Sequence, residues 1–133
     1  MKLLLDTHVW IWSQEAPDRL GAHAKRLLLG AEHENHVSTI STLEVARLVA
    51  TGAISMSIPL REWVERALQA MQARTIQLSH EIALQAYALP EPFHKDPADR
   101  LLVAAARCHE LTLLTADERI LAYRGARSRD ARR

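Results

Sequence analysis

Short apolar runs alternate with segments of helical periodicity along the chain, and this alternation predicts an α/β fold. Four runs have the length and composition of strands buried on both faces of a sheet: residues 2–6, 36–40, 75–78 and 111–115. Between them, apolar residues recur at spacings of three and four, as in helices packed on a sheet; these segments are residues 20–29, 41–50, 60–73, 79–88 and 97–109. Strands alternating with helices indicate βαβ crossovers, so we expect a mostly parallel central sheet flanked by helices.

The length and composition are those of one compact domain. The chain has 133 residues, of which 48% are hydrophobic and 25% charged, and this is enough apolar material to fill a core. It contains no internal repeat and no linker long enough to divide domains. Residues 89–95, LPEPFHK, form the one loop rich in helix breakers, and its two prolines are expected to carry the chain across the sheet edge.

The hydropathy pattern predicts neither a targeting segment nor a membrane span. Met1 and Lys2 are followed by only three leucines before Asp6, and no apolar run approaches the roughly 18 residues that cross a bilayer. We therefore expect a cytoplasmic protein that does not contact a membrane. The single cysteine, Cys108, cannot form an internal disulfide, and its place in an alanine-rich helical segment predicts a core position.

Basic residues are concentrated near the end of the chain. The formal net charge is +1, yet five arginines fall within residues 124–133. A basic segment of this kind is either an electrostatic arm toward nucleic acid or an acidic partner, or a solvated end without a partner. We expect residues 124–133 to form a flexible basic tail outside the folded domain.

Acidic residues gather where the loops that follow the predicted strands meet. In open α/β sheets, ligands bind outside the carboxyl ends of the strands. The residues that the pattern places at this edge are acidic: Asp6, Glu44, Asp96, Asp99 and Asp117. The sequence therefore predicts an acidic site at the carboxyl edge of the sheet.

Helix capping accounts for some of these acids. Ser41-x-x-Glu44 has the form of a capping box, and Asp96, which a proline follows, suits the start of a helix. Asp117 either caps a short helix over residues 117–123 or has a chemical role.

Capping does not account for Asp6 and Asp99. Asp99 lies three and four residues before Leu102 and Val103, which places its carboxylate on the apolar stripe that faces the sheet. An acid that ends a buried strand, as Asp6 does, costs several kcal/mol of desolvation unless a cation or a hydrogen-bond donor meets it. Both acids are therefore candidates for chemistry.

A divalent cation would relieve the repulsion between carboxylates that converge on one sheet edge. Without a cation, some of the carboxylates would hold protons at neutral pH. Mg²⁺ and Mn²⁺ prefer hard oxygen ligands, and Mg²⁺ keeps several waters beside one or two carboxylates, which leaves positions open for phosphate oxygens. Such an ion polarises a phosphodiester and lowers the pKa of a bound water, so these residues favour a hydrolytic site.

The histidines and tryptophans favour other roles. His33 and His36 have a spacing used by zinc ligands, but no cysteine or further histidine is suitably placed, so we expect both on the surface. His94 precedes the acid pair, and it either approaches the pocket or serves only the loop. Trp10 and Trp12 lie in a densely apolar segment, which favours a core or oligomer contact over base stacking.

Four stretches of the sequence resemble the VapC-type toxins of the PIN-domain family. They are LLLDTHVWIW, VSTISTLEVARL, LPEPFHKDPADRLLVAAA and LTLLTADERILAY, and they follow the family's order over roughly residues 2–123. The DPADRLLVAAA stretch with a downstream TAD is the most specific. Two features depart from the family's pattern: Leu43 stands where an aromatic residue often precedes the glutamate, and RGARSRDARR stands where many members have a hydrophobic final strand.

The resemblance implies a PIN-like three-layer sandwich over residues 1–123 and a metal-dependent ribonuclease, the toxin of a toxin–antitoxin pair. Such a toxin is usually a homodimer that a small antitoxin holds inactive, and it cleaves RNA to leave a 5′-phosphate and a 3′-hydroxyl. The family's acidic constellation falls on Asp6, Glu44, Asp99 and Asp117. Asp6, Asp99 and Asp117 are the implied ligands of Mg²⁺ or Mn²⁺, and Glu44 either ligates the ion or orients the attacking water as a general base.

Further candidates surround this acidic set. The residues expected just behind the metal ligands are Asp96, Thr115 and His94. The positive residues expected to contact RNA phosphates are Arg47, Lys95 and Arg100, together with the arginines of residues 124–133.

Two other classes of function fit part of the pattern. A phosphoacceptor domain also has an aspartate at the end of its first strand, but a dehalogenase-type site has a second aspartate where this chain has His8, and no lysine follows the last strand as a receiver domain requires. In a non-catalytic binding module the acids would serve as helix caps, which explains Glu44 and Asp96 but not Asp6.

Overall fold

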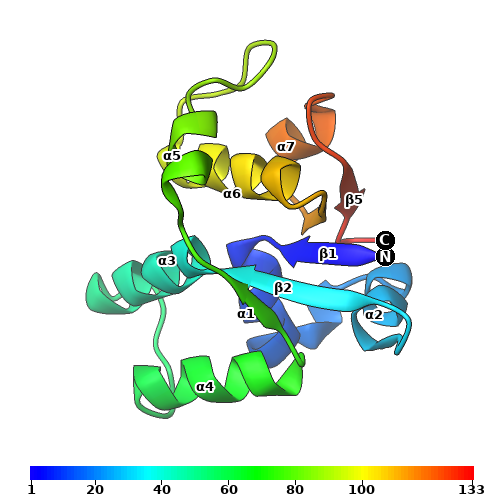
Figure 1. The fold of residues 1–133 in the computed structure, drawn as a ribbon. Helices are drawn as coiled ribbons and strands as arrows, with labels where there is room; N and C mark the ends of the chain where they lie inside the picture. Colours follow the sequence, from blue (N-terminus) through cyan, green and yellow to red (C-terminus); the bar gives the residue numbers. More distant parts are fainter.

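The computed structural model describes all 133 residues and contains one five-stranded sheet with helices on both faces (Figure 1). The strands are β1 (Lys2–Leu5), β2 (Glu34–Ser38), β3 (Arg74–Ile76), β4 (Thr112–Thr115) and β5 (Ser128–Asp130). Their order across the sheet is β3-β2-β1-β4-β5, and every pairing is parallel. The predicted parallel sheet flanked by helices is confirmed.

The two faces of the sheet have separate cores because neighbouring strand residues point to opposite sides. Leu3 and Leu5 of β1 belong to one core and Leu4 to the other. The helices of the first face are α1 (Thr7–Glu15), α2 (Ala22–Leu29) and α4 (Leu60–Ala70). The helices of the second face are α5 (His80–Gln85), α6 (Pro97–Cys108) and α7 (Glu118–Ala122). None of the helices is both long and apolar enough to cross a membrane.

Helix α3 (Thr39–Ala50) begins earlier than predicted and contacts both α1 and α6. Ser38, not Ser41, is its N-cap, because the Ser38 hydroxyl accepts a hydrogen bond from the N–H of Ile40. The capping box predicted for Ser41 and Glu44 is therefore wrong. Ser41 is fully buried in the first turn of the helix, and Glu44 lies in the second turn, where capping no longer explains it.

The segment expected to be a flexible tail is part of the sheet. Residues 128–130 form β5, which pairs with β4, and the flanking bonds run from Leu113 N–H to the Arg127 carbonyl and from Ala131 N–H to the Thr115 carbonyl. Ala131 is completely buried. The expectation is wrong because backbone bonding to one neighbouring strand, rather than an apolar side-chain pattern, holds this strand in place.

Three burial predictions have mixed outcomes. Trp10 is completely buried and packs edge-on against Trp63 with ring centroids 5.1 Å apart, which confirms its core position. Cys108 is exposed because it lies at the end of α6 on the solvent side, so its predicted core position is wrong. His36 is buried within β2, and its Nδ1 lies 3.0 Å from the carbonyl oxygen of Leu3, so its predicted surface position is wrong.

Candidate active site

Asp6 lies where β1 ends and α1 begins, at the carboxyl edge of the sheet. Only 3% of this residue is exposed. Its Oδ1 accepts a hydrogen bond of 2.7 Å from the N–H of Thr7, and its Oδ2 accepts one of 2.6 Å from the hydroxyl of Thr115. Two donors thus offset part of the cost of burying the carboxylate and fix its orientation.

Thr115, the last residue of β4, links Asp6 to Asp117. Its hydroxyl donates to Asp6 and accepts a hydrogen bond of 3.0 Å from the N–H of Asp117. Asp117 in turn caps α7 by accepting a 2.8 Å hydrogen bond from the N–H of Arg119. The pairing of β1 with β4 therefore brings two of the predicted metal ligands together through one threonine.

Glu44 reaches the same edge from α3. The hydroxyl oxygen of Thr7 contacts both Glu44 Oε1 and the Ser41 hydroxyl, the latter at 2.9 Å. Because a hydroxyl has one proton and a carboxylate can only accept, Thr7 donates to Glu44 and accepts from Ser41. Thr7 thus connects the start of α1, which Asp6 caps, to the glutamate on α3.

Asp96 and Asp99 occupy the start of α6. Asp96 is the N-cap, as predicted, and accepts a 3.0 Å hydrogen bond from the N–H of Asp99. The Asp99 side chain is 14% exposed, and its Oδ2 lies 2.9 Å from His94 Nε2 and 3.9 Å from the Arg119 guanidinium. That histidine nitrogen makes no well-aligned hydrogen bond, so its contact with Asp99 is electrostatic rather than directional.

The carboxylates repel one another most strongly at Asp99. Burial, followed by the negative charges of Asp6, Asp96, Asp117 and Glu44, raises the pKa of Asp99 to about 7. The five acids therefore share one electrostatic environment, although they come from separate segments of the sequence. At neutral pH the nearby Arg119 does not balance all of these negative charges.

Glu44 and Asp117 differ in how their surroundings act on them. Burial and the charge of Asp6 raise the pKa of Glu44, although the Thr7 hydrogen bond opposes the shift. Burial also acts to raise the pKa of Asp117, but the hydrogen bonds and the charge of Arg119 outweigh burial and hold that pKa below its usual range. Asp117 is thus kept ionised, whereas Glu44 has an increased affinity for a proton.

The chemistry of this donor set fits a hard divalent cation. Every carboxylate supplies only oxygen, and the raised pKa of Asp99 marks negative charge that the neighbouring side chains do not balance. No three acidic, histidine or cysteine side chains are already gathered around one point. A cation held by Asp6, Asp99 and Asp117 would accordingly keep water molecules among its ligands, as Mg²⁺ commonly does.

His8 and Arg119 belong to the site, although the sequence did not single them out for it. His8 Nε2 accepts a 3.0 Å hydrogen bond from the N–H of Ala116, and its Nδ1 lies 3.6 Å from Asp6 Oδ2. In the neutral ring the proton is therefore on Nδ1, on the side of Asp6. The position of His8 in the first turn of the helix, two residues after the Asp6 cap, is the signal that could have found it.

Of the three predicted RNA contacts on the domain, two are exposed and one forms hydrogen bonds within the protein. Arg47 and Lys95 are exposed. Arg100 instead donates hydrogen bonds to the carbonyl oxygens of Ala86, Phe93 and His94. Arg100 thus holds the loop before α6 in place through its Nε and Nη1 atoms, and its contact with RNA stays a prediction.

Comparisons with known proteins agree with the fold and with the resemblance in the sequence. The PIN domain family model matches residues 3–126. Ribonuclease VapC22 of Mycobacterium tuberculosis is 37% identical over 125 residues, which is 94% of each chain. VapBC2 from Rickettsia felis, solved bound to a DNA fragment from the promoter, has a TM-score of 0.70 at 17% identity over 97% of this chain and 98% of that chain. A toxin–antitoxin complex from Klebsiella pneumoniae has a TM-score of 0.65 at 21% identity over 97% of both chains. The two solved structures share the fold, and the family match together with the VapC22 relative shows that this chain belongs to the PIN-domain family.

Proposed function

We propose that this protein is a metal-dependent endoribonuclease and the toxin of a toxin–antitoxin pair. The observation that carries the proposal is the environment of Asp6. Asp6 is buried at the sheet edge and accepts hydrogen bonds from two donors, and Glu44, Asp99 and Asp117 lie in the same electrostatic environment. An all-oxygen site of this kind suits hydrolysis of a phosphodiester. The name of the VapC22 relative, a ribonuclease, supports RNA as the substrate.

Asp6, Asp99 and Asp117 are the residues that would hold Mg²⁺ or Mn²⁺. When bound, such an ion polarises the scissile phosphodiester and acidifies a water molecule. Thr115 orients Asp6 and the backbone of Asp117 for this role, and Asp96 fixes the start of α6 so that Asp99 faces the site.

We assign Glu44 the role of the general base that activates the attacking water. The Thr7 hydroxyl holds its Oε1, which leaves Oε2 to accept a proton from the water. Its raised pKa matches that task, because a general base must retain the proton that it takes. Attack of the water on phosphorus with rupture of the bond to the 3′-oxygen leaves a 5′-phosphate and, once the 3′-oxygen is protonated, a 3′-hydroxyl.

We propose a protein antitoxin and a second copy of this chain as partners. Large apolar side chains are exposed on α3 and around α5: Leu43 is 65% exposed, Leu84 68% and Tyr87 67%. Large apolar side chains that are exposed to this degree are available for contact with a partner. The toxin–antitoxin complex from Klebsiella pneumoniae, which shares the fold, supports the antitoxin. Light scattering at micromolar concentration tests the dimer, and a mass near the 15.0 kDa of one chain would contradict it.

Cleavage of a labelled structured RNA tests the nuclease. Wild type and Asp6→Asn protein are each assayed with Mg²⁺, with Mn²⁺ and with chelator, and circular dichroism verifies that both are folded. We expect cleavage only by wild type and only with metal. If folded, antitoxin-free wild type neither cleaves RNA nor is stabilised by Mn²⁺, the acids serve as helix caps in a non-catalytic module and the proposal is wrong.

A further inference from the structure

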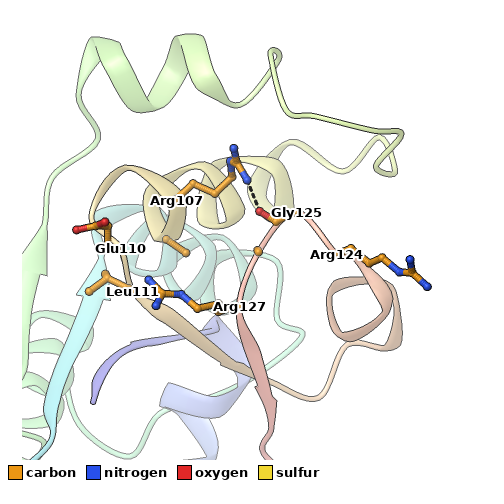
Figure 2. A pocket seen from close by; sticks show the side chains of 8 residues that line it. Arg107, Glu110, Leu111, Arg124, Gly125 and Arg127 are labelled. Carbon is orange, nitrogen blue, oxygen red and sulfur yellow. Dashed lines mark hydrogen bonds between the residues drawn. The ribbon is translucent and has the colours of Figure 1, made fainter.

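A cavity with arginines in its lining lies at the end of the sheet opposite the acidic site. It measures about 310 Å³ and lies between the end of α6 and the segment that joins α7 to β5 (Figure 2). The charged residues of the lining are Arg107, Arg124, Arg127 and a single acid, Glu110. The cavity therefore has an excess of positive charge.

These three arginines differ from most others near the end of the chain. Arg119, Arg132 and Arg133 each have a carboxylate within 4.0 Å. Arg107, Arg124 and Arg127 have none.

The hydrogen bonds of the three arginines are also few. The Arg107 guanidinium donates to the Gly125 carbonyl, as the dashed line in Figure 2 shows. The side chains of Arg124 and Arg127 make no hydrogen bond within the protein. Their guanidinium groups are free to bind an external anion.

Arg124 connects this cavity to the acidic site. It also lines a second cleft of about 390 Å³, to which His94 and Arg119 contribute, and both of these residues contact Asp99. Figure 2 shows the Arg124 side chain directed away from Arg127. Positively charged residues therefore continue from the acidic site past α7 to the end of α6. Along the axis of α6, Asp99 and Arg107 are about 12 Å apart.

We propose that this basic lane, made of Arg119, Arg124, Arg107 and Arg127, binds the phosphates of single-stranded RNA that extends away from the scissile bond. The inference rests on the proposed ribonuclease function. Arginine binds phosphate through its planar set of donors, and phosphate contacts position a strand without reading its sequence. A cavity of about 310 Å³ has room for one phosphate group.

The test compares two pairs of arginines on two substrates. The double variant Arg124→Gln with Arg127→Gln removes two charges that no internal bond uses. The matched control, Arg26→Gln with Arg61→Gln, removes two exposed arginines on α2 and α4 that also lack carboxylate partners. Hydrolysis of an RNA of about 12 nucleotides and of a dinucleotide is measured against NaCl concentration with Mg²⁺ present.

For the lane variant, we expect the KM of the longer RNA to rise roughly tenfold with little change in kcat. The slope of log kcat/KM against log salt concentration should become shallower by about 1.4, because each lost phosphate contact on a single strand removes about 0.7. Hydrolysis of the dinucleotide, which is too short to extend from the acidic site to Arg124 and Arg127, should match wild type. All values of the control variant should also match wild type.

Two results would overturn the lane. One is a KM and a salt slope for the longer RNA that equal those of wild type. The other is a KM of the dinucleotide that rises as much as that of the longer RNA, because the two arginines would then act at the acidic site and not on an extended strand. If wild type hydrolyses neither substrate and is not stabilised by Mn²⁺, the proposed function itself fails. Fluorescence anisotropy of the same labelled RNA, with its salt slope, then tests the lane separately.

Discussion

Two acidic clusters lie at the carboxyl edge of the same sheet, one around Asp99 and one at Asp130, and they differ in how their charge is balanced. Thr115 of β4, which bonds Asp6, pairs in register with Asp130 of β5. Asp130 accepts hydrogen bonds of 2.9 and 2.8 Å from the Arg132 guanidinium, and these bonds hold its pKa at about 2. Asp99, beside His94, instead has its pKa raised to about 7 by burial and by four other carboxylates.

The difference between the clusters separates structural acids from acids available for chemistry. Arg132 and Arg133, two and three residues after Asp130, balance its charge, so Asp130 does not require a metal ion. The negative charge around Asp99 is assembled from several elements and is left without an equal number of cations. Missing charge compensation, rather than the mere presence of acids, is what marks the candidate site.

The largest expected effect is on catalysis. Asp99→Asn should reduce RNA cleavage by roughly 10³-fold, because it removes a proposed metal ligand. Asp130→Asn, its counterpart at the neighbouring strand end, should leave the rate within about twofold. Rates are measured with Mg²⁺ on a labelled RNA. Equal losses in the two variants would erase the distinction between the clusters.

Metal binding should distinguish the same two variants without any substrate. At a Mn²⁺ concentration near 100 times its Kd, wild type should gain about 2.7 kcal/mol of stability, which raises Tm by roughly 8 °C. Asp130→Asn should keep this saturable rise, and Asp99→Asn should lose most of it. Thermal unfolding followed by circular dichroism measures both. A rise that persists in Asp99→Asn would remove this residue from the ligand set.

The pH dependence of stability should have opposite signs for the two acids in metal-free protein. The folded-state pKa of Asp99 is raised from 3.8 to about 7, so its ionisation destabilises the fold fully above pH 7 and not at all below about pH 4. Asp99→Asn should therefore stabilise the protein at pH 8 by about 2 kcal/mol, after allowance for solvent screening.

Asp130 supplies the comparison for this pH series. Its folded-state pKa is lowered from 3.8 to about 2, so it stabilises the fold above pH 4 and ceases to do so as the pH falls toward 2. Asp130→Asn should cost less than about 1 kcal/mol at pH 8, as for other exposed ion pairs. Urea unfolding in chelator at several pH values measures both variants, and shifts of the same sign would contradict the assignment.

The smallest expected effect concerns the packing that holds Asp130 and its partners Arg132 and Arg133 in place. A side chain at Gly21 would place its Cβ 2.0 Å from the carbonyl carbon of Arg133, so Gly21→Ala should displace the residues around Arg132 and cost about 1 kcal/mol. Hydrogen exchange of the Ala24 amide, which donates to the Arg133 carbonyl at 2.9 Å, should accelerate.

Gly52→Ala is the control for that substitution. Gly52 has φ of +77° and open space around it, so alanine there strains only the local backbone. Gly52→Ala should lower the free energy of global unfolding. The exchange rate of the Ala24 amide should change only as much as this loss of global stability requires. The same acceleration in both variants would show that the anchoring is not specific to the Gly21 contact.

The sequence predicted the parts of the fold that depend on burial. Leucine runs marked β1 and β4 because both faces of those strands are covered. Strand β5 has the sequence SRD and is held by backbone bonds to β4, so no apolar pattern announced it. The start of α3 was misplaced because Ser38 and Ser41 are equally suited to capping by type, and only the folded backbone shows which one accepts the bond.

The site was predictable as a set of acids but not as a network. Asp99 could be placed from its spacing to the apolar residues of α6, and Asp6 from its position at the end of a buried strand. The contacts of Thr7 with Glu44 and of His8 with the Ala116 amide join residues far apart in sequence. Such contacts depend on the positions in which the helices pack against the sheet. For the same reason, the carbonyl contacts of Arg100 could not be foreseen.

Strand β5 also ends the sheet, and its outer side has no partner strand. An open strand edge is a template onto which another chain can add, and charged side chains on the edge oppose such addition. Arg129 lies on this strand and Arg127 directly precedes it, and both are exposed. This charged segment, expected from the sequence to be a flexible tail, thus completes the sheet while protecting the molecule against edge-to-edge aggregation.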